Sequence, residues 1–185
     1  LVPTFPTIQL PNSMLRVYPE RADYTSELLK GLPLIVTNHR ERSAFNFSPY
    51  QGEKLRPVIT YNYDNEHITP YSFDVELDDN RMKAEYALSH QSAIYRITYE
   101  ADKPAYLIVN SRNGSIHANE NFISGRQQLN DNTNVYVYIE AQEKPISAGI
   151  LENGTIETSK DNAEGANACA AWRFADGTTT VNLRY

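Results

Sequence analysis

Four histidines are the residues best suited to metal or acid–base chemistry: His39, His67, His90 and His117. They lie far apart and form no His-x-x-x-His or His-Glu-x-x-His pair, so their spacing indicates no metal site. The only cysteine, Cys169, has alanines on both sides, which is typical of a small buried thiol rather than a nucleophile. It also excludes an internal disulfide and a zinc cage built from cysteines.

His39 differs from the other histidines because of its neighbours. It lies in the polar run 37–43, directly after the apolar run 32–36. Donors and acceptors gathered at a strand end are typical of a site for a polar ligand, which makes Asn38, His39 and Arg40 candidates. A solvated loop, with ion pairs among the charged residues at 40–42, explains the same run equally well.

Carboxylates are plentiful, but no pair of them is distinguished. Hydrolysis of a glycoside needs two carboxyl groups on either side of the sugar. Asp74 and Glu76 share one face of an expected strand, where such residues are mostly solvated, and Asp78 and Asp79 are explained by a turn. The sequence has no Gly-x-Ser-x-Gly and no glycine-rich phosphate loop. We therefore assign no catalytic residue, no metal ligand and no cofactor to this chain.

Composition excludes several classes of protein. The 185 residues carry a net charge of −6, which argues against a nucleic-acid partner, because neutralising phosphates requires a basic face. No apolar run reaches the roughly 20 residues that a membrane-spanning helix needs. Hydrophobic residues make up 41% of the chain, enough to form a core.

The elements that must position any site are β-strands. Residues 93–99 alternate between the two faces of a strand, and residues 135–140 are apolar on both faces, which predicts a strand buried on both sides. Further strands are expected at regular intervals, a spacing that favours an antiparallel β-sandwich. They lie at 14–18, 34–37, 57–63, 71–77, 82–88, 105–110, 146–151, 170–174 and 178–185. The best helix candidate is 22–30, of two turns at most, and the polar stretch 158–167 is expected to be a loop.

Turn signals separate these strands. Four short polar segments predict turns between neighbouring strands: 78–80, Asn113-Gly114, Asn153-Gly154 and Asp176-Gly177. The chain ends on an alternating strand pattern with no polar tail. We therefore expect residues 1–185 to form a single β-sandwich domain, cut from a longer two-domain protein.

Three motifs, in order, resemble glycoside hydrolase family 92. The first is Thr4-Phe5-Pro6 followed by Pro11, Met14 and Pro19, which is similar to the family's amino-terminal signature. The second, 68–77, resembles its Pro-Gly-Tyr-Tyr-x-Val-x-Leu strand. The third runs from Lys83-Ala84-Glu85 through Tyr95-Arg96-Ile97-Thr98-Tyr99, where Tyr95 replaces a histidine of the family. The matches span most of the first hundred residues.

The resemblance implies an architecture and an activity. Family members are mostly bacterial, calcium-dependent, exo-acting α-mannosidases that invert the anomeric centre. They pair an amino-terminal β-sandwich, of the galactose-mutarotase or supersandwich type, with a helical barrel. That barrel supplies the catalytic residues and the calcium ligands. This chain is similar to the sandwich alone, so we expect it to be inactive by itself. Its expected partners are a carboxy-terminal catalytic domain and, through the parent enzyme, a mannose-containing glycan. No membrane span and no nucleic-acid partner are expected. A periplasmic or cell-surface location is expected.

The same resemblance points to two sugar-binding loops. Phe5 and Pro6 match the family's Phe-Pro near the pocket, and Asn38, His39 and Arg40 fall where the family carries a loop that faces the cleft. An anchor between the domains is an equal explanation for Phe5 and Pro6. The alternative function is a free-standing carbohydrate-binding or protein-interaction module of a secreted bacterial protein.

Overall fold

The computed structural model describes residues 7–21, 23, 25–36, 43–56, 60–77, 81–130 and 132–185, without the side chains of Ile35 and Val36. The described residues form strands and loops and no helix. The strands are β1 (Leu28–Leu29), β2 (Leu32–Val36), β3 (Ser43–Tyr50), β4 (Tyr61–Ile68), β5 (Ser72–Leu77), β6 (Met82–Leu88), β7 (Ala93–Thr98), β8 (Tyr106–Ala118), β9 (Ile123–Asn130), β10 (Thr133–Ala141), β11 (Ser147–Glu152), β12 (Thr155–Glu157), β13 (Asn162–Arg173) and β14 (Thr180–Arg184). The predicted all-β class is confirmed.

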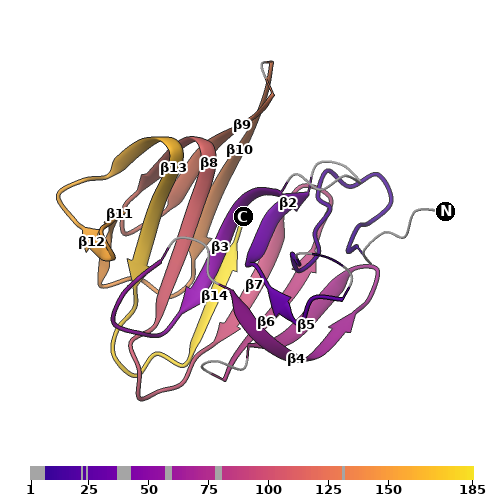
Figure 1. Ribbon diagram of the computed structural model, residues 1–185, viewed down its shortest axis with the longest axis horizontal. Helices are drawn as coiled ribbons and strands as arrows, with labels where there is room; N and C mark the ends of the chain where they lie inside the picture. The colour runs from indigo at the N-terminus through magenta and orange to yellow at the C-terminus, as the bar shows by residue number, and fades with distance from the viewer. Residues whose placement is uncertain are drawn as a thin grey trace.

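The strands form two layers that meet at β14 (Figure 1). Hydrogen-bonded neighbours follow the order β1-β4-β5-β6-β7-β14-β10-β9-β8-β13-β11-β12, and β3 joins β2 to β8. All pairings are antiparallel. β14 pairs with β7 along its whole length, from Thr180 to Arg184, but with β10 only at Arg184 and Leu183. The two layers therefore separate beyond this point.

Aromatic side chains from both layers fill the core between them. On β7 the side chains of Ala93, Tyr95 and Ile97 are buried, which confirms the predicted alternation. The Tyr95 ring lies 4.1 Å from that of Phe47 on β3, measured between ring centroids. Such edge-to-face contacts stabilise packed aromatic pairs beyond the area they bury. Tyr95, where the family motif carries a histidine, therefore belongs to the core.

Three expectations for individual segments are wrong. The segment 22–30 is not a helix, because Leu28 and Leu29 form β1 and pair with β4. The stretch 158–167 is not a loop throughout, because β13 begins at Asn162 and pairs with β8. The strand at 135–140 is buried on one face only: Tyr136 and Tyr138 are 69% and 51% exposed. Tyrosine tolerates this position because its ring packs on the sheet while its hydroxyl meets water.

Strand positions elsewhere also differ from the pattern. Residues 14–18 contribute only an isolated bridge from Val17 to Ile8, and β4 begins at Tyr61, while 57–59 of the predicted strand 57–63 lie outside the described residues. The strands β3 and β9 are not predicted at all. Both are short of alternating apolar residues, because β3 is buried on both faces and β9 carries polar residues that bond inside the sheet.

The turn signals have mixed outcomes. Asn153-Gly154 joins β11 to β12 with φ values of 52° and 84°, as a tight hairpin requires. Asp176-Gly177 lies in the turn before β14, with φ of 82° at Gly177. Asn113-Gly114 is not a hairpin but an irregularity inside β8, where a Cβ on Gly114 would lie 1.8 Å from the Arg126 carbonyl oxygen. The predicted turn at 78–80 lies outside the described residues, between the paired ends of β5 and β6.

Candidate functional site

The predicted site residues Phe5, Pro6, Asn38, His39 and Arg40 all lie outside the described residues. The structure does show the two strands, β2 and β3, that the segment 37–42 connects. β2 and β3 pair antiparallel, with Val36 opposite Ser43, so the loop 37–42 connects two adjoining strand ends. The predicted polar segment thus connects the two strands of a β-hairpin that belongs to the sandwich. The roles of Asn38, His39 and Arg40 stay predictions.

A buried glutamine on β9 holds the base of this hairpin. The Gln127 Oε1 atom accepts hydrogen bonds from the backbone N–H groups of Phe45 and Arg112, at 2.9 and 3.1 Å. Its Nε2 atom donates to the Ser43 carbonyl oxygen at 3.1 Å. Gln127 is 4% exposed, so these bonds form away from water, where losing one is costly. The glutamine thus ties the start of β3 to β8 and β9.

Phe45 carries an unusual backbone at the same place. Its φ is +51°, a region that a bulky residue rarely adopts, and its side chain is buried. The ring lies against Gly125, where an added Cβ would approach Phe45 Cε1 to 2.8 Å. Strained residues of this kind are held by their surroundings and are common near binding sites. Sequence reasoning missed Gln127, Phe45 and Gly125, and no local pattern signals them.

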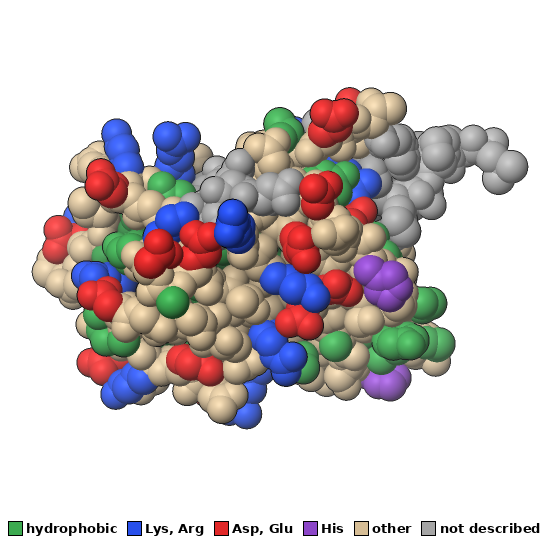
Figure 2. All heavy atoms as spheres, turned by 90° about the horizontal axis from the view of Figure 1, so that it is seen from below, with side chains coloured by type: hydrophobic (Ala, Val, Ile, Leu, Met, Phe, Trp, Pro, Cys, Tyr) green, Lys and Arg blue, Asp and Glu red, His purple; other side chains and the backbone are tan. Residues whose placement is uncertain are grey.

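A wide groove follows the outer face of β5, β6, β7, β14 and β10, and we call it the polar groove. Its volume is about 950 Å³. The outward side chains along it are Asp74, Glu85, Arg96, Asn182, Arg184 and Glu140, alternating with the buried side chains of the same strands. Acidic and basic side chains are also interspersed on the side of the molecule seen in Figure 2. Planar amide, guanidinium and carboxylate groups in this arrangement can hydrogen-bond a polyhydroxyl ligand.

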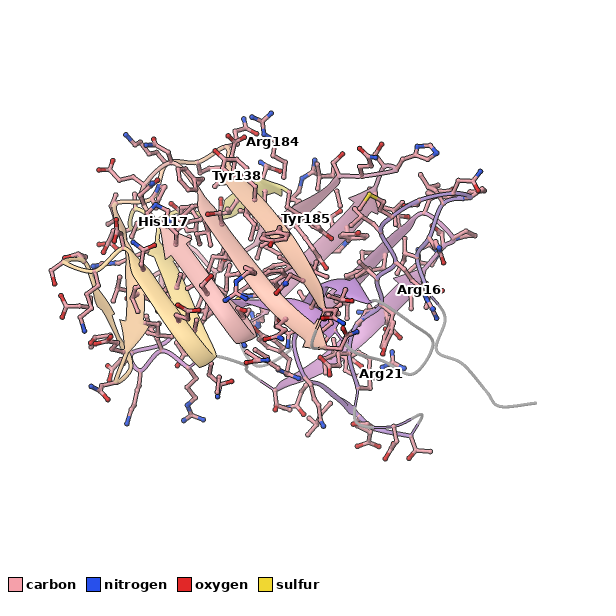
Figure 3. The ribbon with its side chains drawn as sticks, turned by 90° about the horizontal axis from the view of Figure 1, so that it is seen from above. Arg16, Arg21, His117, Tyr138, Arg184 and Tyr185 are labelled. Carbon is pink, nitrogen blue, oxygen red and sulfur yellow. The ribbon has the colours of Figure 1, made fainter. Side chains whose placement is uncertain are left out.

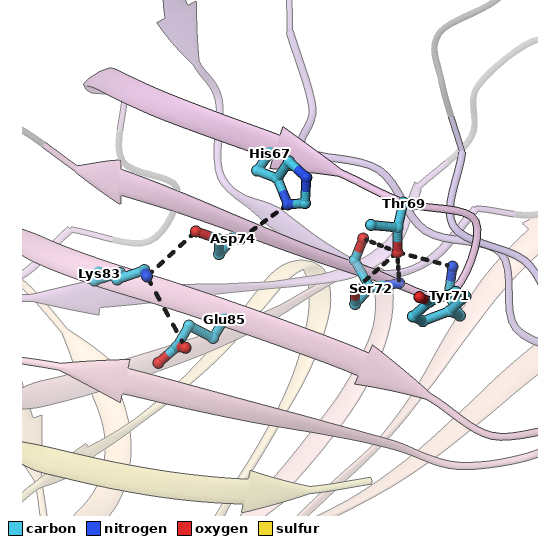
Figure 4. A network of polar contacts seen from close by, with 7 residues as sticks. All are labelled: His67, Thr69, Tyr71, Ser72, Asp74, Lys83 and Glu85. Atoms are coloured by element: carbon cyan, nitrogen blue, oxygen red, sulfur yellow. Dashed lines mark hydrogen bonds and ion pairs between the residues drawn. The ribbon is translucent and has the colours of Figure 1, made fainter.

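Ion pairs join neighbouring strands along the border of this groove, and Figure 4 shows those of Asp74. Lys83 Nζ lies 3.2 Å from Asp74 Oδ1, and His67 Nδ1 lies 3.5 Å from Asp74 Oδ2. Lys83 also lies 4.0 Å from Glu85, and Arg96 lies 3.9 Å from that carboxylate. These carboxylates are bound to cations on adjacent strands, which suits a solvated surface rather than an acid and base placed for catalysis. Asp74 and Glu76 follow the predicted surface pattern.

A second groove, of about 570 Å³, runs beside β10, and we call it the edge groove. Its walls come from β10, from the amino-terminal segment and from the last residue of the chain. They comprise Gln9, Met14, Leu15, Arg16, Gln91, Val135, Tyr136, Val137, Tyr138 and Tyr185. Figure 3 shows Tyr138, Tyr185 and Arg16 along this side of the molecule. Most of these lining side chains are apolar or aromatic and Met14 is 73% exposed, whereas the polar groove is lined by five charged side chains, so the edge groove is the more apolar of the two surfaces.

An aromatic stack adjoins both grooves. The rings of His117 and Phe122 lie 5.3 Å apart, and those of Phe122 and Tyr138 are stacked at 5.0 Å. The Tyr138 hydroxyl lies 3.3 Å from Glu140 Oε1. Partial loss of solvation, and then the Glu140 charge, raise the pKa of Tyr138. An exposed ring with polar neighbours can contact the apolar face of a sugar.

The described part of the chain shows neither a metal-binding cluster nor a membrane-spanning helix. No group of three or more His, Cys, Asp or Glu side chains there is arranged to hold a metal ion. Nor does a helix in that part have the length and apolar character needed to cross a membrane. Cys169 is buried, as predicted, and burial raises the pKa of its thiol to about 12, so the nucleophilic thiolate is scarce at neutral pH.

The two layers of antiparallel strands make this chain a β-sandwich domain. Comparison with known proteins gives its family. The sequence model of the glycosyl hydrolase family 92 N-terminal domain matches residues 2–185. The chain therefore belongs to this family, as the motifs predict, and corresponds to its amino-terminal domain. No curated protein sequence matches the chain significantly.

Solved structures share this fold. The chain is similar to a family 92 inverting mannosidase from Bacteroides thetaiotaomicron, with a TM-score of 0.80 and 17% identity over 96% of the chain. It is also similar to a family 92 α-mannosidase from the same organism, with a TM-score of 0.79 and 21% identity over 98% of the chain. A structure of the second enzyme contains mannoimidazole. The chain spans only 27% and 30% of these two proteins.

Proposed function

We propose that this chain is the non-catalytic amino-terminal part of an α-mannosidase, which packs on a helical catalytic domain and lends loops to the sugar pocket. The observation that carries the proposal is the family match over 2–185, in a chain that spans less than a third of its mannosidase relatives. Most of such an enzyme lies outside this domain. The substrate class is a mannose-containing glycan.

The hairpin base supports the part of the proposal that concerns the pocket. Gln127 fixes the first residues of β3, on the carboxyl side of 37–42, through Ser43 and Phe45, so the strand that follows the candidates Asn38, His39 and Arg40 is held in place. A site held on strands loses less conformational entropy when it binds a ligand than a free loop does. Phe5 and Pro6 are the second proposed contact with the terminal sugar.

The proposal includes a cofactor and a location. Calcium is bound by the catalytic domain, not by this chain, and the protein acts in the periplasm or at the cell surface. Both features come from the family resemblance. Within the described residues, the carboxylates of the polar groove are paired with cations, which fits a supporting role for this domain.

A second candidate function rests on the aromatic stack. Tyr136 and Tyr138 point outward from one strand and are more than half exposed, with Phe122 stacked behind Tyr138. Aromatic platforms of this kind suit a free-standing carbohydrate-binding module. This reading needs no catalytic domain, so it differs from the first in the length of the protein and in its activity.

One experiment separates these functions. The full-length protein encoded by the gene is assayed with an aryl α-mannoside, before and after calcium is removed with a chelator and restored. We expect hydrolysis that is lost and regained with calcium, and a fall of at least tenfold in kcat/KM for His39→Ala or Arg40→Ala. Lys160→Ala, at a distant surface pair with Glu152, is the control and leaves kcat/KM unchanged. A full-length protein that binds mannan without hydrolysing it favours the binding module.

A further inference from the structure

One side of β10 has no strand partner for most of its length. On its other side, β9 pairs with β10 from Thr133 to Ile139. On this side, β14 pairs only with Glu140 and Ala141. No other described strand lies there, and the edge groove occupies the space. An open strand edge in the middle of a strand order is unusual, because it leaves backbone donors and acceptors ready to bind another strand.

The hydrogen-bond pattern shows which residues face this open side. The Gln142 N–H donates to the Asn182 carbonyl oxygen at 2.8 Å, so this pair is of the hydrogen-bonded kind. In an antiparallel pair such residues recur at every second position. Glu140, Tyr138 and Tyr136 therefore turn their N–H and C=O groups toward the β14 side. For Tyr136 and Tyr138, no described strand is there to receive them.

Apolar side chains border the groove. Leu15, Val137 and Tyr185 line it; Leu15 and Val137 are already more than nine-tenths buried, and Tyr185 is partly exposed. Arg16 also lines it, and its Nε atom is buried without a hydrogen-bond partner among the described residues. Buried polar atoms are nearly always bonded in complete domains. The unpaired Arg16 Nε therefore indicates an acceptor that the described residues do not supply.

We propose that the edge groove binds the segment that directly follows Tyr185 in the longer protein, as a continuation of β14 paired antiparallel with β10. This inference rests on the proposed function, since it requires the chain to continue. The register is set by Arg184 opposite Glu140 and Leu183 opposite Ala141. Each further residue on β14 moves one residue back on β10. The first residue after Tyr185 thus lies opposite Tyr138, and the third lies opposite Tyr136.

The register also predicts the chemistry of this segment. Val181 and Leu183 are buried, and the ring of Tyr185 stacks on that of Tyr95 at 6.3 Å. Because side chains alternate along a strand, the second and fourth residues after Tyr185 face the core, over Val137 and Val135. We infer that both are apolar. The first and third face outward, beside Tyr138 and Tyr136.

Covalent connection favours this occupant over a second copy of the chain. Tyr185 already lines the groove, and its hydroxyl donates to the Leu34 carbonyl oxygen at 2.6 Å, so the strand end is anchored there. A segment attached at that point binds within the molecule, at a high effective concentration. A separate chain would also lose translational and rotational freedom on binding. A dimer through β10 is therefore the outcome that competes with the proposal.

Cysteine cross-linking in the full-length protein tests the register. The first residue after Tyr185 is replaced by cysteine and combined with Tyr138→Cys, whose side chain is exposed. Directly opposite residues have Cα atoms about 5.5 Å apart, within the range of a disulfide. The matched control combines the same cysteine with Tyr136→Cys, two residues further along. The native Cys169 is buried and does not compete.

We expect an intramolecular disulfide with Tyr138→Cys and at least tenfold less with Tyr136→Cys under mild oxidation. Hydrogen exchange provides the second measurement: the Tyr136 and Tyr138 amides should be protected as strongly as that of Val137. Equal cross-linking of both variants, no cross-linking, an intermolecular disulfide or unprotected amides would overturn the inference. If calcium-dependent mannosidase activity is present when these tests fail, only the inference fails. If the gene ends near Tyr185, the proposed function fails as well.

Discussion

The polar groove lies over the face of β14 and its neighbours, the edge groove lies beyond the end of β14 beside β10, and the two differ in how complete their backbone pairing is. In the polar groove, β14 is paired with β7 along five residues, and the outward charges are bound to partners on neighbouring strands. In the edge groove, β14 is paired with β10 at two residues, and apolar side chains border an open strand edge. A sheet face needs only its side chains to be satisfied, whereas a sheet edge needs another backbone. The described strands complete the backbone pairing under the first surface and leave one edge of β10 unpaired at the second.

The largest effect should come from the core beneath the polar groove. Tyr95→Ala removes a ring that contacts Phe47, Phe73 and Tyr86, and should lower the free energy of unfolding by about 3–5 kcal/mol. The neighbouring Ile94 is 59% exposed in the groove, so Ile94→Ala should change it by about 0.5 kcal/mol or less. Urea denaturation measures both. An equal loss for Ile94→Ala would show that the polar groove is a buried face.

The second largest effect concerns β9, which pairs with β10 on the side away from the edge groove. Gln127→Ala removes three hydrogen bonds from a buried side chain that joins β3, β8 and β9. We expect a loss of about 2–3 kcal/mol in the free energy of unfolding. Gln128→Ala is the control, because its contact with Asn113 is exposed and long, at 3.4 Å. In the full enzyme Gln127→Ala should also raise KM, whereas unchanged kinetics would show that the hairpin base does not support the site.

High pH should weaken the core that both grooves share. Burial raises the pKa of Tyr95, Tyr99 and Tyr185 well above the usual 10.0. The folded state therefore keeps protons that the unfolded state releases, and stability falls as pH rises through 10. The loss is on the order of 1 kcal/mol in total at pH 10 and is absent below about pH 9. Urea midpoints and phenolate absorbance report it. Stability that stays level through pH 10 would contradict the burial of these hydroxyls.

The smallest effect is expected for the ion pairs of the polar groove. Lys83 bridges Asp74 and Glu85, but all three side chains are about a third exposed. Pairs of this kind contribute about 0–1 kcal/mol and weaken with salt. Lys83→Met should therefore shift the unfolding midpoint slightly at low salt and not at all at high salt. If Lys83→Met lowered the free energy of unfolding as much as Gln127→Ala does, the charges of the polar groove would be structural rather than solvated, which would contradict this comparison.

Local patterns predicted the fold where burial follows a regular period. The strand at 82–88 has the predicted bounds, and β7 shows the predicted alternation. Local patterns failed where contacts with segments distant in the sequence decide the structure. Asn113-Gly114 has the composition of a turn, yet β8 continues past it as a local irregularity, because β8 pairs with β13 on both sides of Asn113. The tyrosines of β10 appear as core residues in the sequence, but no described layer covers them, and Tyr136 and Tyr138 are 69% and 51% exposed.

The candidate site shows the same division. The polar run at 37–43 and the family motifs are visible in the sequence, and they predicted the family that the match over 2–185 confirms. The residues that hold the hairpin are not visible. Gln127 lies more than eighty residues from Ser43 and Phe45, and it becomes their partner only when β9 folds onto β3. Long-range contacts of this kind leave no periodic signal.

The sequence by itself determined the all-β class, the family and the domain to which the chain corresponds, because strand periodicity and short motifs are local properties. Only the tertiary structure decided which strand edges are closed. The open edge of β10 depends on where β14 ends relative to it, and the strain at Phe45 depends on Gly125 lying beneath its ring. Such features arise when distant segments meet, because a strand is completed by its neighbours in space rather than by its neighbours in the chain.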